Sequence, residues 1–269
     1  MLRNLAILLM TLSLALIAPG CKSQKKGGRV STVTPQATAN APSTSTRKEP
    51  PTLPAGAKAG PLDLSKIGPH DKTYAHESLG ADEWAEVALM YQAKGQNGQA
   101  LSTLNNALAR YPGSAHLYAI RGALWLQLRE YAKAVADLKK SLDLQEDPGV
   151  RVNYAEALRK FGRKQDALKN LDQALSEKPG FFPALFNRGV LRYQTGDKKG
   201  AIDDFSEAIK IDPKAAAPYF NRASILWQEG RKEAAIRDMA KFVELAPVGS
   251  WKDTGKTLLS TWREQVKDN

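Results

Sequence analysis

The chain has 269 residues, of which 42% are apolar and 25% charged, the balance of a globular protein with a sizeable core. Basic residues outnumber acidic ones by 39 to 28, but residues 22–80 alone hold nine basic and four acidic side chains. The remainder is only mildly basic and lacks a stripe of basic and aromatic residues, which argues against a nucleic-acid partner. His70, His76 and His116 have no partners at metal-site or triad spacing, so we expect no enzymatic activity, cofactor, metal or small-molecule substrate.

Residues 1–20 have the pattern of a secretion signal peptide. Arg3 supplies a positive start, and residues 5–17 form an almost unbroken apolar run that ends just before Cys21. A membrane-spanning helix needs about 20 apolar residues, so the run fits the apolar part of a signal peptide instead. Because Cys21 is the only cysteine, it cannot form a disulfide within the chain.

The position of Cys21 directly after the apolar run resembles the lipobox of bacterial lipoproteins, in which this cysteine is acylated after cleavage. The resemblance implies a protein held in the bacterial cell envelope by at least two acyl chains, which is enough for stable anchoring. Lys22 follows where a retention signal would often place Asp, which favours the outer membrane, facing the periplasm. Residues 18–20 also satisfy the small-x-small rule of ordinary signal cleavage, a route that would release a soluble protein.

Residues 21–80 form an expected disordered tether whose first residue carries the lipid. Residues 32–54 are mainly Ser, Thr, Pro and Ala, which cannot bury enough apolar surface to fold. A flexible chain of this length reaches roughly 40–45 Å on average. Residues 61–67 are more apolar than their surroundings, and they either dock on the folded part or form plain linker.

From Ala81 onward the sequence repeats with a period of 33 or 34 residues, the strongest signal in the chain. Three columns of small, alanine and large apolar residues recur. The small residues are Ala88, Gly122, Ala155, Gly189 and Ala223, the alanines are Ala100, Ala134, Ala167, Ala201 and Ala235, and the large residues are Leu104, Leu138, Leu171, Phe205 and Met239. Each block is predicted to form two amphipathic helices joined at a glycine, which Arg129 replaces in the second block.

This pattern resembles the tetratricopeptide-repeat family, most clearly between Leu185 and Pro213. The resemblance implies an all-α solenoid of five helix-turn-helix repeats that fold by stacking, closed by a C-terminal capping helix. The expected repeats are residues 81–114, 115–147, 148–181, 182–215 and 216–249, and the expected cap is residues 250–269. Trp251, Leu258, Trp262 and Val266 lie on one helical face, which either covers the last repeat or serves as a partner site.

The resemblance also implies that the first helix of each repeat lines a concave face. Asn153, Asn187 and Asn221 share one column there, and a primary amide pairs with both the N–H and the C=O of a peptide. The neighbouring candidates are Phe186, Val190, Tyr193 and Phe220 as apolar anchors, and Arg188 and Arg222 as partners of a carboxylate. Alternatively, the asparagines satisfy local backbone groups and the arginines pack their aliphatic stems.

These features predict a non-enzymatic adaptor that holds envelope proteins or extended peptide segments in a concave groove and the membrane through its lipid. Lipid-anchored proteins of this build resemble type IV pilus pilotins, scaffolds of peptidoglycan hydrolases and gliding-motility lipoproteins. The adaptor is therefore expected to assemble or localise a pilus, secretion, motility or cell-wall machine. Two other functions stay open: a periplasmic holdase for outer-membrane proteins, and a structural protein that self-assembles through its terminal Trp face.

Overall fold

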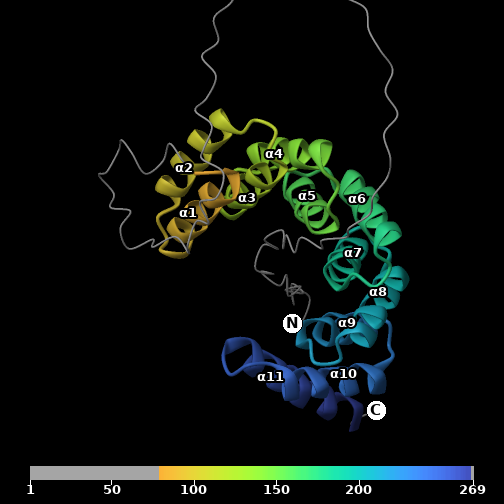
Figure 1. Ribbon diagram of the computed structural model, residues 1–269. Coiled ribbons are helices and arrows are strands. Elements are labelled where there is room, and N and C mark those ends of the chain that lie inside the picture. Colours follow the sequence, from red (N-terminus) through yellow and green to blue (C-terminus); the bar gives the residue numbers. More distant parts are fainter. Residues whose placement is uncertain (1–78, 268–269) are drawn as a thin grey trace, which may run out of the picture. The chain divides into compact units, whose positions relative to one another are not determined.

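The computed structural model describes residues 79–267, which are almost entirely helical (Figure 1). The expected signal segment, Cys21 and the tether up to residue 78 lie outside the described residues. Residues 79–267 form eleven helices, of which the first ten make five successive pairs, numbered here as repeats 1 to 5. The prediction of an all-α repeat array with a terminal helix is therefore confirmed.

The two helices of each repeat are nearly constant in length, and α11 follows the last repeat. The first helices are α1 (Ala81–Ala93), α3 (Ala115–Gln127), α5 (Pro148–Lys160), α7 (Phe182–Gln194) and α9 (Ala216–Gln228). The second helices are α2 (Asn97–Arg110), α4 (Tyr131–Leu144), α6 (Lys164–Glu177), α8 (Lys198–Ile211) and α10 (Lys232–Leu245), and α11 is Ser250–Lys267.

The turn inside each repeat contains one residue with a left-handed backbone. In four repeats this residue is a glycine, with φ between 73° and 92°, namely Gly95, Gly162, Gly196 and Gly230. In repeat 2 it is Arg129, with φ of 64°. An L-residue with a Cβ costs roughly 1–2 kcal/mol in this conformation, so the turn between α3 and α4 is strained.

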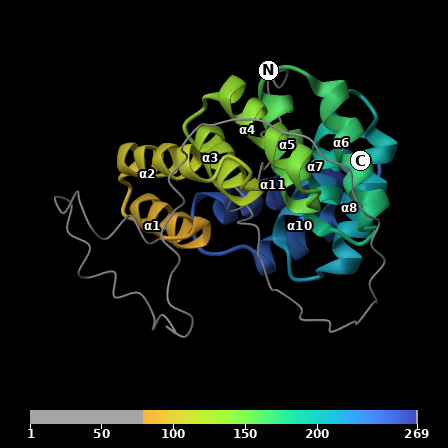
Figure 2. The ribbon, with the colours of Figure 1, turned by 45° about the horizontal axis from the view of Figure 1, so that its top comes forward.

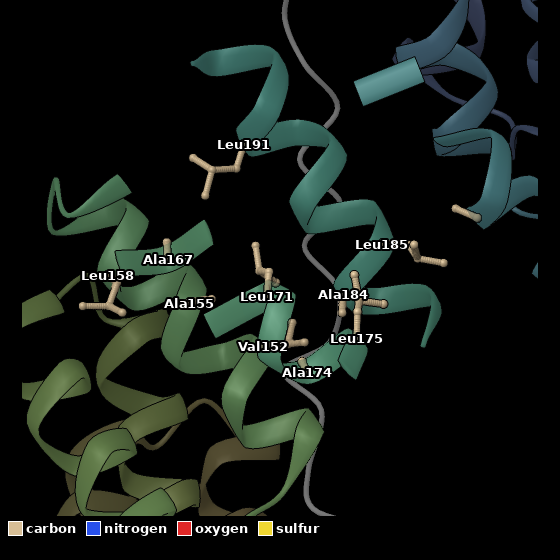
Figure 3. Close-up of a cluster of buried hydrophobic side chains, with 11 residues drawn as sticks. Val152, Ala155, Leu158, Ala167, Leu171, Ala174, Leu175, Ala184, Leu185 and Leu191 are labelled. Carbon is tan, nitrogen blue, oxygen red and sulfur yellow. The ribbon is translucent and has the colours of Figure 1, made fainter. Parts of the chain in front are cut away.

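Small residues allow the helices of a repeat to cross closely. The five alanines of the second helices are all 0% exposed. A Cβ added to Gly122 would lie 2.6 Å from Cγ of Leu138, and one added to Gly189 would lie 2.9 Å from Cε1 of Phe205. Figure 3 shows the buried alanines and leucines that fill the space between α5, α6 and α7.

The repeats stack in chain order, as Figures 1 and 2 show. Each second helix contacts the first helix of the next repeat, and α3 also contacts both α1 and α5, as α5 contacts α7. The first helices therefore form the inner side of the array and the second helices its outer side (Figure 1). Among residues 79–267, no helix combines the length and the apolar character that crossing a bilayer requires.

Helix α11 covers the end of the array by packing on repeat 5. Trp262 stacks on Trp227 of α9, with ring centroids 4.5 Å apart, and Trp251 meets the edge of Phe220 at 6.0 Å. The side chain of Trp262 is thereby buried within its own chain. The apolar face of α11 therefore covers the last repeat, while Trp251 and Leu258 stay half-buried.

Candidate functional site

Three apolar candidates lie in the core and not on an open face. Phe186 and Val190 of α7 and Phe220 of α9 are only 1%, 2% and 4% exposed. The ring centroid of Phe186 lies 5.7 Å from that of Phe205, and Phe220 packs against α11. The expectation that these side chains line a ligand surface is corrected, because the neighbouring helices cover them and they stabilise the stack instead.

Arg188 is engaged in ion pairs within the protein. Its Nη2 donates to Oδ1 of Asp204 at 2.7 Å, and its Nη1 donates to Oδ1 of Asp172 in α6 at 2.8 Å. Arg192 adds a further hydrogen bond to Asp204 at 2.9 Å. Burial lowers the pKa of Arg188, but the two carboxylates outweigh it and raise the pKa, so the guanidinium stays charged. The cation holds α6, α7 and α8 together.

Arg222 and Arg121 repeat this arrangement in other parts of the array. Arg222 donates from Nε to Asp238 at 2.6 Å and from Nη1 to Ser206 of the preceding repeat at 2.9 Å. Arg121 pairs with Asp137 of α4 through Nε at 2.7 Å. The expectation that Arg188 and Arg222 meet a carboxylate is met by acids of this chain, which leaves them structural instead of ligand-binding.

The asparagine column is divided by burial. Asn153 is 7% exposed and Asn221 is 0% exposed, so neither side chain is accessible to a peptide that binds from outside. Asn187 is half-buried, and its Nδ2 donates to the carbonyl oxygen of Pro183 at 2.8 Å. Local backbone satisfaction, the alternative reading of this column, therefore holds for Asn187. Its amide keeps a second N–H and the carbonyl oxygen for another group.

A row of polar side chains connects the first helices of neighbouring repeats. Tyr193 of α7 donates to Gln228 of α9 at 3.1 Å, and Arg159 of α5 donates to Gln194 of α7 at 3.2 Å. We call these residues, with Asn187, the inner row. They lie on the side that the first helices share, where Tyr193 and Gln194 are half-buried and Gln228 is exposed. Of the inner row, only Asn187 and Tyr193 were predicted from the sequence as partner-binding residues. The signal that could have identified the others is the constant separation of 35 residues between the bonded partners.

The three buried aspartates of the array have structural partners. Asp137, Asp204 and Asp238, at most 7% exposed, all accept hydrogen bonds from arginines. Among residues 79–267, no cluster of His, Cys, Asp and Glu is placed to hold a metal ion. Apart from the guanidinium of Arg159, the inner row consists of amide and hydroxyl groups.

Models of the tetratricopeptide-repeat family match residues 88–150, 154–216 and 216–248, which together exceed half of the chain. Among curated proteins, the TPR repeat-containing protein MJ1345 of Methanocaldococcus jannaschii is 39% identical over 66 residues. That match spans 24% of this chain and only 21% of the relative's own length. The likeness to this relative is therefore confined to the repeats.

Several solved structures share the fold. PilF of Pseudomonas aeruginosa superposes with a TM-score of 0.60 at 19% identity, over 70% of this chain and 90% of its own. MamA of Desulfovibrio magneticus gives 0.56 at 17% identity, over 61% and 94%. YrrB, described as a TPR protein with an unusual peptide-binding site, gives 0.53 at 20% identity, over 66% and 92%. At these identities the likeness extends to the fold alone.

Proposed function

Since this chain belongs to the tetratricopeptide-repeat family, whose members act as protein–protein interaction scaffolds, we propose that it binds an extended polypeptide along the inner row. The observation that carries the proposal is the set of bonds from Arg159 to Gln194 and from Tyr193 to Gln228. These bonds connect three successive first helices and hold the amide and hydroxyl groups of α7 and α9 in fixed positions. Preorganised groups of this kind lower the entropy cost of binding a flexible chain.

The arginines around the inner row are paired within the chain, which favours recognition of the partner's backbone by the neutral groups of the row. Arg188 and Arg222 are engaged within the chain, and Arg159 is held by Glu156 through two hydrogen bonds of 2.7 and 2.6 Å. What the row offers a partner is therefore neutral donors and acceptors. Amide groups of this kind pair with the N–H and C=O of an extended strand whatever its sequence. The peptide-binding site described for YrrB is consistent with such a role.

We place this adaptor in the bacterial envelope, anchored by lipid on Cys21 and facing the periplasm from the outer membrane. Support comes from the sequence alone, because Cys21 directly follows an apolar run in the manner of a lipobox. A tether of the length of residues 21–80 would let the array reach roughly 40 Å from the bilayer. On this proposal the protein assembles or localises a pilus, secretion, motility or cell-wall machine.

In vivo photo-crosslinking tests the binding face. A crosslinker replaces Asn187 in the anchored protein, and a matched control replaces Lys199, an exposed residue of α8 on the outer side. We expect one dominant envelope protein to be captured from Asn187 and not from Lys199. Many unfolded outer-membrane proteins would indicate the holdase instead, and equal capture at both positions would refute the site.

The anchor is tested separately by Cys21→Ser. We expect this variant to move from the membrane fraction to the soluble periplasmic fraction and to lose incorporation of labelled palmitate. Ser23→Ala, two residues further on, is the control and should stay in the membrane. A membrane-bound Cys21→Ser variant would contradict lipidation, but it would leave the proposal for the binding face unchanged.

A further inference from the structure

Two kinds of side-chain bond join neighbouring repeats. In the first, an arginine of a first helix donates to the second helix of the preceding repeat, which we call an arginine link. In the second, a residue near the end of a first helix bonds to the next first helix, which we call an inner link. The arginine links are Arg121 to Asn105 (2.8 Å), Arg188 to Asp172 (2.8 Å) and Arg222 to Ser206 (2.9 Å). The inner links are Gln92 to Gln127 (2.6 Å), Arg159 to Gln194 (3.2 Å) and Tyr193 to Gln228 (3.1 Å).

Both kinds of link occur together at three of the four junctions. One of each joins repeats 1 and 2, repeats 3 and 4, and repeats 4 and 5. Lys198 and Glu229 form a further ion pair of 2.6 Å between repeats 4 and 5. Hydrogen bonds are directional, so two of them at separate points on a junction restrain both the distance and the rotation between repeats.

At the junction between repeats 2 and 3 the residues that would form both links have changed. Tyr154 occupies the arginine position, and the facing side chain is Lys139, which turns back to Asp143 of its own helix at 2.7 Å. The inner position holds Leu126, which has no polar group, opposite Lys160. Neither the arginine link nor the inner link is therefore formed at this junction.

Apolar packing holds this junction instead. Leu126, Leu138 and Leu142 of repeat 2 form one buried cluster with Val150 and Ala157 of α5. Such contacts stabilise the junction through buried area but do not depend on direction, so the two surfaces are able to slide over one another. Shear between packed helices is one of the common modes of protein motion.

The connecting segment is bonded to α4 by its backbone and to repeat 3 by side chains: the N–H of Gln145 donates to the carbonyl oxygen of Ser141 at 2.9 Å. Arg151 of α5, whose side chain is 6% exposed, bonds to Glu146 in the segment and lies 3.5 Å from Glu177 of α6. These contacts fasten the end of the segment to repeat 3. Gln145 directly follows α4 and has an extended backbone, so the segment leaves α4 in an extended conformation before its bonds to repeat 3.

We infer that the array bends at the junction between repeats 2 and 3. Helices α1–α4 move as one unit and helices α5–α11 as the other, while the inner row, which lies wholly in the second unit, keeps its geometry. Bending alters the curvature of the inner side beside the inner row. The array therefore closes on a partner or releases it without disturbing the bonded side chains. This property does not depend on which partner is bound.

Distance measurements between spin labels on the outer side test the inference. Ala136, Lys169 and Asp203 are exposed and occupy the same place in α4, α6 and α8. In the full chain with Cys21→Ser, labels at 136 and 169 span the junction in question, and labels at 169 and 203 span the linked junction that follows. We expect the distance distribution of the first pair to be about twofold broader than that of the second. Equal widths, or a broader second pair, would overturn the inference.

A second variant restores the missing arginine link. Tyr154→Arg combined with Lys139→Asp places an arginine opposite a carboxylate, as at the junction between repeats 3 and 4. We expect the distribution for labels at 136 and 169 to narrow, and that for labels at 169 and 203 to stay unchanged. Lys139→Asp alone is the control. If the double variant, folded by circular dichroism, does not narrow the distribution, the link does not restrain the bend and the inference fails.

Discussion

Replacing Arg188 by Ala separates a structural arginine from a ligand-binding one. The carboxylate of Asp204 is 3% exposed and would keep only Arg192 as an ionic partner. Removing one partner of a buried ion pair costs roughly 3–5 kcal/mol. Because Arg192 remains and the Arg188 side chain is itself 18% exposed, we expect about 2–3 kcal/mol. For an array of this size that loss lowers Tm by roughly 4–12 °C.

Urea denaturation of the full chain, followed by circular dichroism, measures this loss. Arg and Ala have similar helix propensities, so the change reports the ion pairs and not the helix itself. The matched control is Arg163→Ala, which removes a pair with Asp166 whose side chains are 50% and 38% exposed. Such a surface pair contributes about 0–1 kcal/mol. If Arg188→Ala and the control unfold at the same urea concentration, the ion pairs of Arg188 do not stabilise the fold, and Arg188 is again a candidate for binding a ligand.

Four further substitutions test the packing and the turn. Gly122→Ala should destabilise the chain by about 1–3 kcal/mol through overpacking, whereas Gly98→Ala, with nothing within 4 Å of its Cβ, should stabilise it by up to about 1 kcal/mol. Arg129→Gly should raise the unfolding free energy by about 1 kcal/mol by relieving the left-handed backbone, and an unchanged denaturation midpoint would count against strain there. Trp262→Ala should cost about 3–5 kcal/mol and change the near-ultraviolet circular dichroism that arises from the packed Trp227–Trp262 stack; an unchanged spectrum would argue against the stack.

The fold was predictable because its rules are local. An alanine every 33 or 34 residues marks a helix crossing too close for a larger side chain, as the 0% exposure of Ala134 and Ala201 shows. Turn glycines mark a backbone that other residues adopt at a cost. Arg129 has the left-handed conformation without the glycine, since the stacking of repeats on either side outweighs a penalty of roughly 1–2 kcal/mol.

The candidate site was less predictable because exposure depends on what the next helix covers. Phe220 belongs to a first helix, like the residues that face the inner side, but α11 packs over it. Likewise, the sequence around an arginine such as Arg222 looks the same whether its carboxylate partner belongs to this chain or to a bound ligand. The partner, Asp238, lies 16 residues away on a different helix, a spacing that carries meaning only once the pairing of the helices is known.

The internal pairing of the arginines has a consequence for how a partner is recognised. If cations bound the partner, raising the salt concentration would weaken binding several-fold, because exposed charge pairs are screened within about 10 Å at 0.1 M salt. The inner row offers mainly neutral amide and hydroxyl groups, whose hydrogen bonds do not depend on ionic strength in this way. We therefore expect crosslinking from Asn187, measured in permeabilised cells, to give the same yield at about 0.1 M and about 0.5 M NaCl. A yield that falls steeply with salt would show that charged residues outside the row, such as exposed lysines, carry the binding.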